Sequence, residues 1–210
     1  KSVPIMFWVQ DLWPESLSAT GAVRSKKILK IVERLVSFIY SRCDRILIQS
    51  RAFSPSIERL GVGHDRIQYF PNSAEEIYEP MVLEPDASER AALSNGFRVM
   101  FAGNIGTAQD FPAILKAAEK LKDYPDIHWL ILGVGRFRPW VEAQIEERGL
   151  EKTVRLLGRH PMELMPRYFS LADVMLVTLK KEYIFSLTIP AKVQSYLACG
   201  RPILAMLDGE

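Results

Sequence analysis

The sequence contains few cysteines and histidines, and no apolar run long enough to cross a bilayer. Cys43 and Cys199 stand far apart in apolar stretches, which predicts buried thiols in a reducing compartment. The three histidines are scattered singly, which argues against a metal site. The apolar runs fall short of the ~20 residues of a membrane-spanning helix, and the first residues form a strand pattern instead of a signal peptide. These absences predict a cytoplasmic protein.

A large excess of charge of one sign is also missing. The chain has 27 Lys and Arg against 25 Asp and Glu, a net charge of +2. Nucleic-acid-binding surfaces are strongly basic, so this balance argues against nucleic acid as a partner. With 48% hydrophobic and 25% charged residues, the 210-residue chain has the composition of one or two compact domains.

Apolar segments alternate with helical patterns along most of the chain, which is typical of a parallel sheet covered by helices on both faces. The alternation breaks at 71–96, a stretch with prolines and acidic residues that predicts a linker with one short helix at most. The predicted strands are 3–10, 45–50, 66–70, 97–103, 128–133, 154–158, 174–179 and 202–207. The predicted helices are 25–42, 53–60, 111–122, 138–148, 162–170 and the segment between Pro190 and Gly200.

This pattern gives two α/β units, and both look incomplete. The first starts without a preceding element, and the second stops after a buried strand with no helix to cover it. We therefore expect the chain to be an excerpt of a longer protein. The alternative is a small two-lobed protein that stands alone.

Ligands of parallel sheets bind beyond the carboxyl ends of the strands, so the loops there are the candidate binding residues. In "FAGNIGTAQDF", Gly103 and Gly106 flank Asn104, and glycines let backbone N–H groups approach a phosphate. A plain strand-to-helix turn is the alternative. The glycines of "LILGVGRFR" are not followed by the third glycine of a dinucleotide-binding fingerprint, which favours a structural turn.

Two further loops carry cations. In "LLGRHPMEL", Arg159 could stack on a base or pair with a phosphate, and an ordinary exposed arginine is the alternative. In "LKKEYIFSLTIPAK", a polar loop with Ser186 and Thr188 leads to a helix whose first turn holds Pro190 and Lys192. Hydroxyls, free N–H groups and a lysine together favour a bound anion, whereas a solvated lysine is the simpler alternative.

Seven stretches follow one another as in bacterial family-4 glycosyltransferases, and the chain resembles most the branch that builds capsule, colanic-acid-like and O-antigen polysaccharides. They are "FWVQDLWPES", "DRILIQSRAF", "IQYFPNSAEEIY", "FAGNIGTAQDF", "LILGVG", "LLGRHPMELMPRYFSLADVMLVTL" and "IPAKVQSYLACGRPILA". The resemblance spans nearly the whole chain. The order of the stretches is much more specific than any one of them.

The resemblance implies a GT-B fold of two Rossmann-like, doubly wound parallel-sheet domains, both incomplete here. Residues 1–72 would be the C-terminal part of the acceptor-side domain, 73–96 the interdomain linker, and 97–210 the truncated domain that binds the nucleotide sugar. The implied reaction is metal-independent, retaining and free of cofactors. It moves a hexosyl or N-acetylhexosaminyl group from a nucleotide diphosphate, UDP in our prediction, to a saccharide or polyprenyl-linked acceptor in cell-surface polysaccharide synthesis.

The sequence departs from the family pattern at several positions. Asn104 and Gln109 stand where many relatives have an arginine and a lysine, and Leu187 and Ser195 stand at the positions of two glutamates. Lys192 is therefore the best candidate partner of the diphosphate, with Arg159 second. The candidate donor-binding residues are Gly103, Asn104, Ile105, Gly106, Arg159, Thr188, Lys192 and Ser195, and the candidate catalytic residues are Asp11 and Lys192.

Two other functions share these features. A UDP-sugar epimerase of GT-B architecture cleaves the same bond, and the missing glutamates give weight to a non-catalytic nucleotide-sugar-binding subunit. A separate question is the helix at 25–42, which is basic and amphipathic. It predicts either peripheral contact with the inner membrane, at its cytoplasmic face, or packing on its own sheet, and the packing alternative is favoured.

Overall fold

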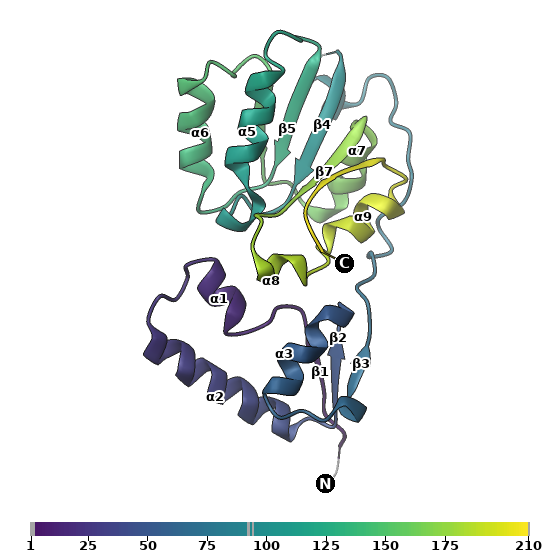
Figure 1. Ribbon diagram of the computed structural model, residues 1–210. Coiled ribbons are helices and arrows are strands. Elements are labelled where there is room, and N and C mark those ends of the chain that lie inside the picture. The colour runs from purple at the N-terminus through teal and green to yellow at the C-terminus, as the bar shows by residue number, and fades with distance from the viewer. Residues whose placement is uncertain (1–2, 92, 94, 210) are drawn as a thin grey trace. The chain divides into compact units, whose positions relative to one another are not determined.

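The computed structural model describes residues 3–91, 93 and 95–209, which form two compact units (Figure 1). The described residues of Lys1–Asn72, Lys181–Ile189 and Asp208–Glu210 form the first unit, and Ser73–Lys180 with Pro190–Leu207 forms the second. This division differs from the predicted domains in three places: 73–96 clusters with the second unit, and 181–189 and 208–209 cluster with the first. The assignment of the units to acceptor and donor stays a prediction.

The first unit contains a parallel three-stranded sheet in the order β1-β2-β3. Its strands are β1 (Met6–Val9), β2 (Arg45–Ile48) and β3 (Ile67–Tyr69). Ile46 in the central strand is fully buried, as are Phe53 and Ile57 from the segment that follows. The helices are α1 (Glu15–Ala19), α2 (Lys26–Arg42), α3 (Ser54–Arg59) and α8 (Tyr183–Ser186). α1 and α8 were not predicted, whereas α2 and α3 confirm the predicted helices.

The second unit contains a parallel five-stranded sheet in the order β6-β5-β4-β7-β8. Its strands are β4 (Phe97–Ala102), β5 (Ile127–Leu132), β6 (Val154–Gly158), β7 (Val174–Thr178) and β8 (Ile203–Met206). The chain runs outward from β4 through β5 to β6 and then returns to β7 on the other side of β4. A ligand crevice is expected where the strand order reverses in this way, at the carboxyl end of β4.

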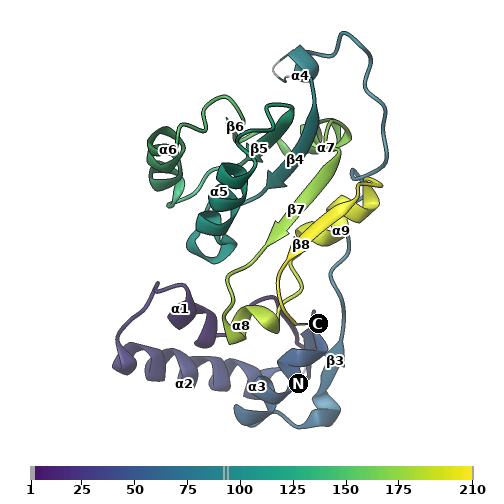
Figure 2. The same cartoon turned by 45° about the horizontal axis from the view of Figure 1, so that its top comes forward.

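Helices cover both faces of this sheet, as Figure 2 shows. α5 (Phe111–Lys120) and α6 (Arg138–Glu147) lie on one side, and α7 (Met165–Ser170) and α9 (Lys192–Ala198) on the other. Side chains of β4 alternate between the two cores, with Val99 and Phe101 in one and Met100 and Ala102 in the other. Burial on both faces explains why the inner strands β4, β5 and β7 are mostly apolar.

Several predicted boundaries need correction. The last helix begins at Lys192, so Pro190 precedes it instead of lying in its first turn, although the Pro190 carbonyl accepts from Val193 N–H at 3.0 Å. The predicted helix 162–170 is a 3₁₀ turn, Met162–Leu164, followed by α7. The predicted linker does contain one short helix, α4 (Ser88–Ala91).

Two expectations from composition can be compared with the structure. Cys43 and Cys199 are both buried free thiols, as predicted. Among the described residues, no helix has the length and apolar character needed to traverse a bilayer.

Candidate functional site

The loop after β4 is packed directly against the loop after β5, and glycines make this approach possible. A Cβ on Gly133 would lie 1.9 Å from the Gly103 carbonyl oxygen, and one on Gly135 would lie 2.3 Å from that of Ile105. Gly133 and Gly103 also have positive φ values of 137° and 140°. The glycines of "LILGVG" therefore have a structural role, which agrees with the turn that the sequence favoured.

The far end of the same loop is attached to β7. Thr178 is buried and its Oγ1 donates to the carbonyl of Gln109 at 2.5 Å. The N–H of Lys180 donates to the carbonyl of Ala108 at 2.8 Å. With contacts to both neighbouring strand ends, the segment 103–110 has a defined position at the crevice.

Tyr196 attaches α9 to the end of β4. Its ring is fully buried, and its hydroxyl donates to the Ala102 carbonyl and accepts from the Ala102 N–H, both at 3.0 Å. Burial raises the pKa of Tyr196 far above its ordinary value, so the phenol stays protonated and can donate. This arrangement fixes the first residue of α9, Lys192, beside Gly103.

Lys192 extends along the floor of the crevice. Its Nζ donates to Gln109 Oε1 at 3.2 Å and lies 3.8 Å from the centre of the Phe101 ring. The same nitrogen is 3.0 Å from the place that a Cβ on Gly103 would take. Burial lowers the pKa of Lys192 to about 7 because the ammonium has lost most of its water. A buried cation between neutral partners would be stabilised by an anion.

Two hollows open at this place. The lysine hollow, of about 260 Å³, is lined by Lys192 with Ser73, Glu75, Tyr78, Ala102, Gly103, Met165, Phe169, Ala191, Ser195 and Tyr196. The histidine hollow, of about 340 Å³, is lined by His160 with Gly103, Asn104, Leu132, Gly133, Val134, Gly158, Arg159 and Met165. Gly103 and Met165 line both, so the two hollows meet at the loop after β4.

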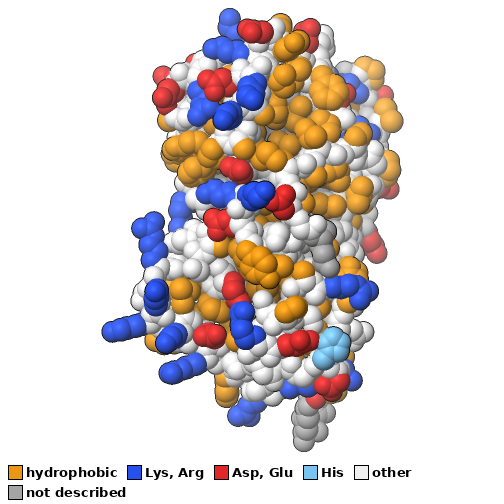
Figure 3. All heavy atoms as spheres, in the orientation of Figure 1, with side chains coloured by type: hydrophobic (Ala, Val, Ile, Leu, Met, Phe, Trp, Pro, Cys, Tyr) orange, Lys and Arg blue, Asp and Glu red, His pale blue; other side chains and the backbone are white. Residues whose placement is uncertain are grey.

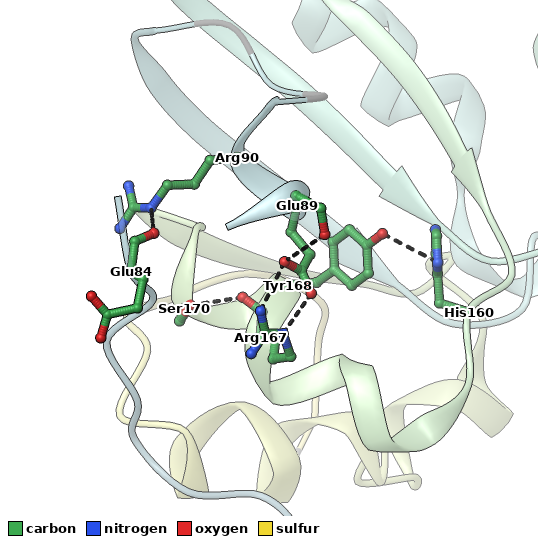
Figure 4. A network of polar contacts seen from close by, with 8 residues as sticks. Glu84, Glu89, Arg90, His160, Arg167, Tyr168 and Ser170 are labelled. Carbon is green, nitrogen blue, oxygen red and sulfur yellow. Dashed lines mark hydrogen bonds and ion pairs between the residues drawn. The ribbon is translucent and has the colours of Figure 1, made fainter. Parts of the chain in front are cut away.

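His160 has a defined tautomer in the histidine hollow. Its Nε2 lies 3.0 Å from the Leu157 carbonyl, which only accepts, so Nε2 carries the proton. Nδ1 then accepts from the Tyr168 hydroxyl at 3.2 Å, and the centres of the two rings lie 4.4 Å apart. Figure 4 shows this contact next to a second one, between Arg167 and Glu89.

The Arg167–Glu89 pair joins α7 to α4. Arg167 Nη2 donates to Glu89 Oε2 at 3.0 Å, and its Nε donates to Oε1 (Figure 4). The hydrogen bonds from Arg167 lower the pKa of Glu89 to about 2, although only 7% of Glu89 is exposed. The ion pair therefore supports the helix that carries Tyr168, and through it the position of His160.

The structure brings together only part of the predicted donor site. Gly103, Asn104 and Arg159 line the histidine hollow, while Lys192 and Ser195 line the lysine hollow. The remaining three predicted residues, Ile105, Gly106 and Thr188, line neither.

Ile105 is the clearest departure. Its side chain is fully buried in the core, its N–H donates to the Val134 carbonyl, and its carbonyl accepts from Phe137. The N–H groups of Gly103 and Gly106 donate to Leu132 and Asn104 carbonyls in the same way. These three N–H groups have partners within the protein, so they would have to change partner to bind a phosphate, and their role in donor binding stays a prediction.

Two predicted residues belong to the first unit. Thr188 donates its hydroxyl hydrogen to the Ile184 carbonyl at 3.3 Å. Asp11 is exposed and lines a hollow of about 280 Å³ whose wall is mostly aromatic and aliphatic, with Trp8, Trp13 and Tyr40 among its residues. Their roles stay predictions.

Sequence reasoning missed Glu75, Tyr78 and His160 as members of the site. Tyr78 and Ser195 both line the lysine hollow, and Glu75 is exposed at the same hollow. Both Glu75 and Tyr78 come from the predicted linker, where no local pattern marks a site. His160 directly follows Arg159 at the end of β6, and that position was the available signal.

The described part of the chain contains no group of three His, Cys, Asp or Glu side chains placed to hold a metal ion. Within the second unit the cations at the hollows are Lys192 and Arg159. This arrangement can hold an anion next to an apolar hollow.

Comparison with known proteins identifies the family. Residues 96–209, more than half of the chain, match the family model described as glycosyl transferases group 1. The chain belongs to this family. The match covers all residues that line the two hollows except Ser73, Glu75 and Tyr78 of the lysine hollow.

Relatives and solved structures agree with the family. The chain is 30% identical over 206 residues to the probable glycosyltransferase WbjE of Pseudomonas aeruginosa, and 24% identical over 199 residues to the putative colanic acid biosynthesis glycosyl transferase WcaI of Escherichia coli. These alignments cover 95% and 91% of this chain but 50% and 48% of the relatives, so the chain spans about half their length.

A crystal structure of Anabaena Alr3699/HepE in complex with UDP and glucose superposes with a TM-score of 0.75 at 17% identity. The match covers 98% of this chain and 53% of that one. The fold is therefore that of the GT-B glycosyltransferases, with parallel α/β sheets.

Proposed function

We propose that this chain belongs to a glycosyltransferase that moves a sugar from a UDP-sugar to a saccharide or lipid-linked acceptor in cell-surface polysaccharide synthesis. The observation that carries the proposal is the buried ammonium of Lys192, which lies beside Gly103 where the two hollows meet. HepE, a structural neighbour, has been crystallised with UDP-glucose. The names of WbjE and WcaI support the same reaction class.

In this proposal the uridine enters the histidine hollow and the diphosphate crosses Gly103 toward Lys192. The histidine hollow has an aromatic ring, His160, and apolar residues such as Leu132 and Val134 for a flat base. Arg159, exposed at its rim, supplies a second cation. The sugar then occupies the lysine hollow, near Glu75 and the hydroxyls of Tyr78 and Ser195.

The chemical task is to stabilise UDP as it leaves. Negative charge develops on the diphosphate as the bond to the sugar breaks, and a fixed cation in a site of low polarity stabilises that charge strongly. Lys192 is placed for this role and needs no movement of its helix, since Tyr196 holds α9 on β4. The proposed reaction transfers a hexosyl or N-acetylhexosaminyl group with retention of configuration. It uses neither a metal ion nor a cofactor.

A non-catalytic subunit that binds a nucleotide sugar is the second candidate. At the two positions of the family's glutamates, Leu187 is buried and Ser195 lines the lysine hollow. Neither can serve as a carboxylate.

The full-length protein incubated with UDP-sugars labelled in the sugar, together with a lipid-linked acceptor fraction, distinguishes these functions. The proposed transferase yields label in a saccharide or lipid product. Label recovered as a different UDP-sugar would indicate the epimerase, and label recovered unchanged, with the nucleotide sugar still bound, would indicate the binding subunit.

We further propose that the protein works in the cytoplasm at the inner face of the membrane, where a polyprenyl-linked acceptor would be presented. Nucleotide sugars and lipid-linked acceptors meet at such an interface.

A further inference from the structure

Gln109 lies at the end of the loop after β4, and its backbone is held in place by other parts of the second unit. Its N–H donates to the Gly106 carbonyl at 3.3 Å, and its carbonyl accepts from the Thr178 hydroxyl at 2.5 Å. The next residue, Asp110, has a positive φ of 48° and is the N-cap of α5. These contacts fix the point from which the Gln109 side chain leaves the backbone.

The contact between Gln109 and Lys192 determines which way the glutamine amide is turned. An ammonium group has hydrogens to donate and no lone pair to accept with, so the amide atom 3.2 Å from Lys192 Nζ is the oxygen, Oε1. The same nitrogen lies 3.0 Å from the place that a Cβ on Gly103 would take. The amide oxygen therefore holds the ammonium directly against the backbone of the loop.

This contact leaves the charge of Lys192 uncompensated. The amide is neutral, as is the Phe101 ring, whose centre lies 3.8 Å from Nζ. The ammonium has three hydrogens, and Gln109 is its one hydrogen-bond acceptor among the described residues. Figure 3 shows Asp and Glu side chains among the Lys and Arg side chains of the second unit, so the face it displays has no broad basic surface that would attract a diphosphate in place of Lys192.

We propose that Gln109 is a positioning residue for the bound nucleotide sugar: its amide oxygen holds the Lys192 ammonium beside Gly103 and leaves the positive charge available to the diphosphate. A lysine side chain is long and flexible, so an ammonium without such a partner would be ordered by the ligand, at a cost in affinity. A carboxylate at position 109 would order the ammonium too, but it would neutralise the charge and repel the ligand. A neutral acceptor orders the ammonium without this loss.

The inference rests on the proposed function, because it names a further residue of the same site. One of its two tests uses UDP and the other uses the empty protein. A wild type that fails to bind UDP would contradict the proposed function, while the empty protein would still test the contact between Gln109 and Lys192. UDP binding that depends on Lys192 but not on Gln109 would contradict this inference alone.

The first test titrates UDP and uridine into the full-length protein and its Gln109 variants. Gln109→Met removes the acceptor at nearly the same length and should weaken UDP about three- to tenfold, with little effect on uridine. Gln109→Glu keeps an acceptor but adds a negative charge, and should weaken UDP at least about tenfold. The matched controls are Gln144→Met and Gln144→Glu, because Gln144 Oε1 also accepts from a cation, Arg148, at 2.8 Å and lines neither hollow. Both controls should bind UDP and uridine as wild type does.

The second test measures urea unfolding of the empty protein between pH 7 and 10.5. The pKa of Lys192 is about 7 in the folded protein against an ordinary 10.5, so the stability of wild type should rise with pH over this range. A carboxylate at position 109 raises the folded pKa, so Gln109→Glu should reduce the rise, whereas Gln109→Met and Gln144→Glu should keep it. Unchanged UDP binding in both Gln109 variants, equal losses for UDP and uridine, or a wild-type rise in Gln109→Glu would overturn the proposal.

Discussion

The ammonium nitrogen of Lys192 lies 3.8 Å from the centre of the Phe101 ring and within hydrogen-bonding distance of Gln109. Both neighbours are neutral, so the cation has attractive contacts but no opposite charge among them. An empty site of this kind carries a desolvation cost that a diphosphate would relieve.

The burial of Lys192 predicts how the stability of the empty protein changes with pH. Its pKa is about 7 in the folded protein against an ordinary 10.5. Between these values the unfolded chain binds more protons than the folded one, so this group makes stability rise with pH from about 7 to 10.5. Below pH 7 both states are charged and the cost is fully present. Urea unfolding of wild type and Lys192→Met across this range should show the rise in wild type only.

The same pKa predicts proton uptake when UDP binds. A diphosphate next to Nζ favours the ammonium, so a protein whose Lys192 is partly neutral at about pH 8 should take up a proton on binding. Calorimetry in two buffers with different ionisation enthalpies measures this directly. Wild type should give different binding enthalpies in the two buffers, whereas Lys192→Met should give equal ones. Equal enthalpies in wild type would mean that the diphosphate lies elsewhere.

The contact between His160 and Tyr168 predicts how a substitution in the histidine hollow changes uridine binding. Tyr168→Phe removes the hydroxyl that donates to His160 Nδ1 and frees the ring to turn. The affinities for uridine and UDP should then both fall by about three- to tenfold, which is ~0.6–1.4 kcal/mol. Tyr124→Phe, at an exposed tyrosine, is the matched control and should change neither. A loss for UDP alone would exclude the histidine hollow as the uridine site.

Gly133 predicts a large loss of stability. In Gly133→Ala the new Cβ would lie 1.9 Å from the Gly103 oxygen, so the two loops must separate, and we expect a loss of about 3 kcal/mol or more. Gly158 also has a positive φ, of 77°, but a Cβ added there would have an Arg138 side-chain nitrogen as its nearest neighbour, at 3.8 Å. Gly158→Ala should therefore lower the free energy of unfolding only by the cost of the left-handed backbone conformation, about 1–2 kcal/mol. Equal urea unfolding midpoints for Gly133→Ala and Gly158→Ala would contradict the close packing of the loop after β4 on the loop after β5.

The strands were predictable because each is a largely apolar run between turn residues, and in β4, β5 and β7 burial on both faces produces this pattern directly. α1 and α8 were missed because each has only four or five residues, fewer than periodicity can identify. Arg159 and Lys192 were found because they follow a strand end and begin a helix, positions that the sequence itself marks. These are local features.

The rest of the site depends on contacts that are distant in sequence. "GNIG" does not reveal that Ile105 turns into the core, because that depends on Phe137 and Val134 from the next loop. Tyr78 joins the site by lining the same hollow as Ser195, more than one hundred residues away. Such pairings cannot be inferred from the pattern of a linker.

The central claim is that Lys192 meets the diphosphate of a nucleotide sugar, and one pair of titrations tests it most directly. UDP and uridine are titrated into wild type, Lys192→Glu and the exposed charge-reversal control Lys116→Glu. The account predicts that Lys192→Glu weakens UDP at least about tenfold, or ~1.4 kcal/mol, because a charge-assisted contact is replaced by repulsion. Uridine, which has no phosphate, should bind nearly as before, and Lys116→Glu should bind both ligands as wild type does. Equal losses for UDP and uridine in Lys192→Glu, or no loss for either, would contradict the account.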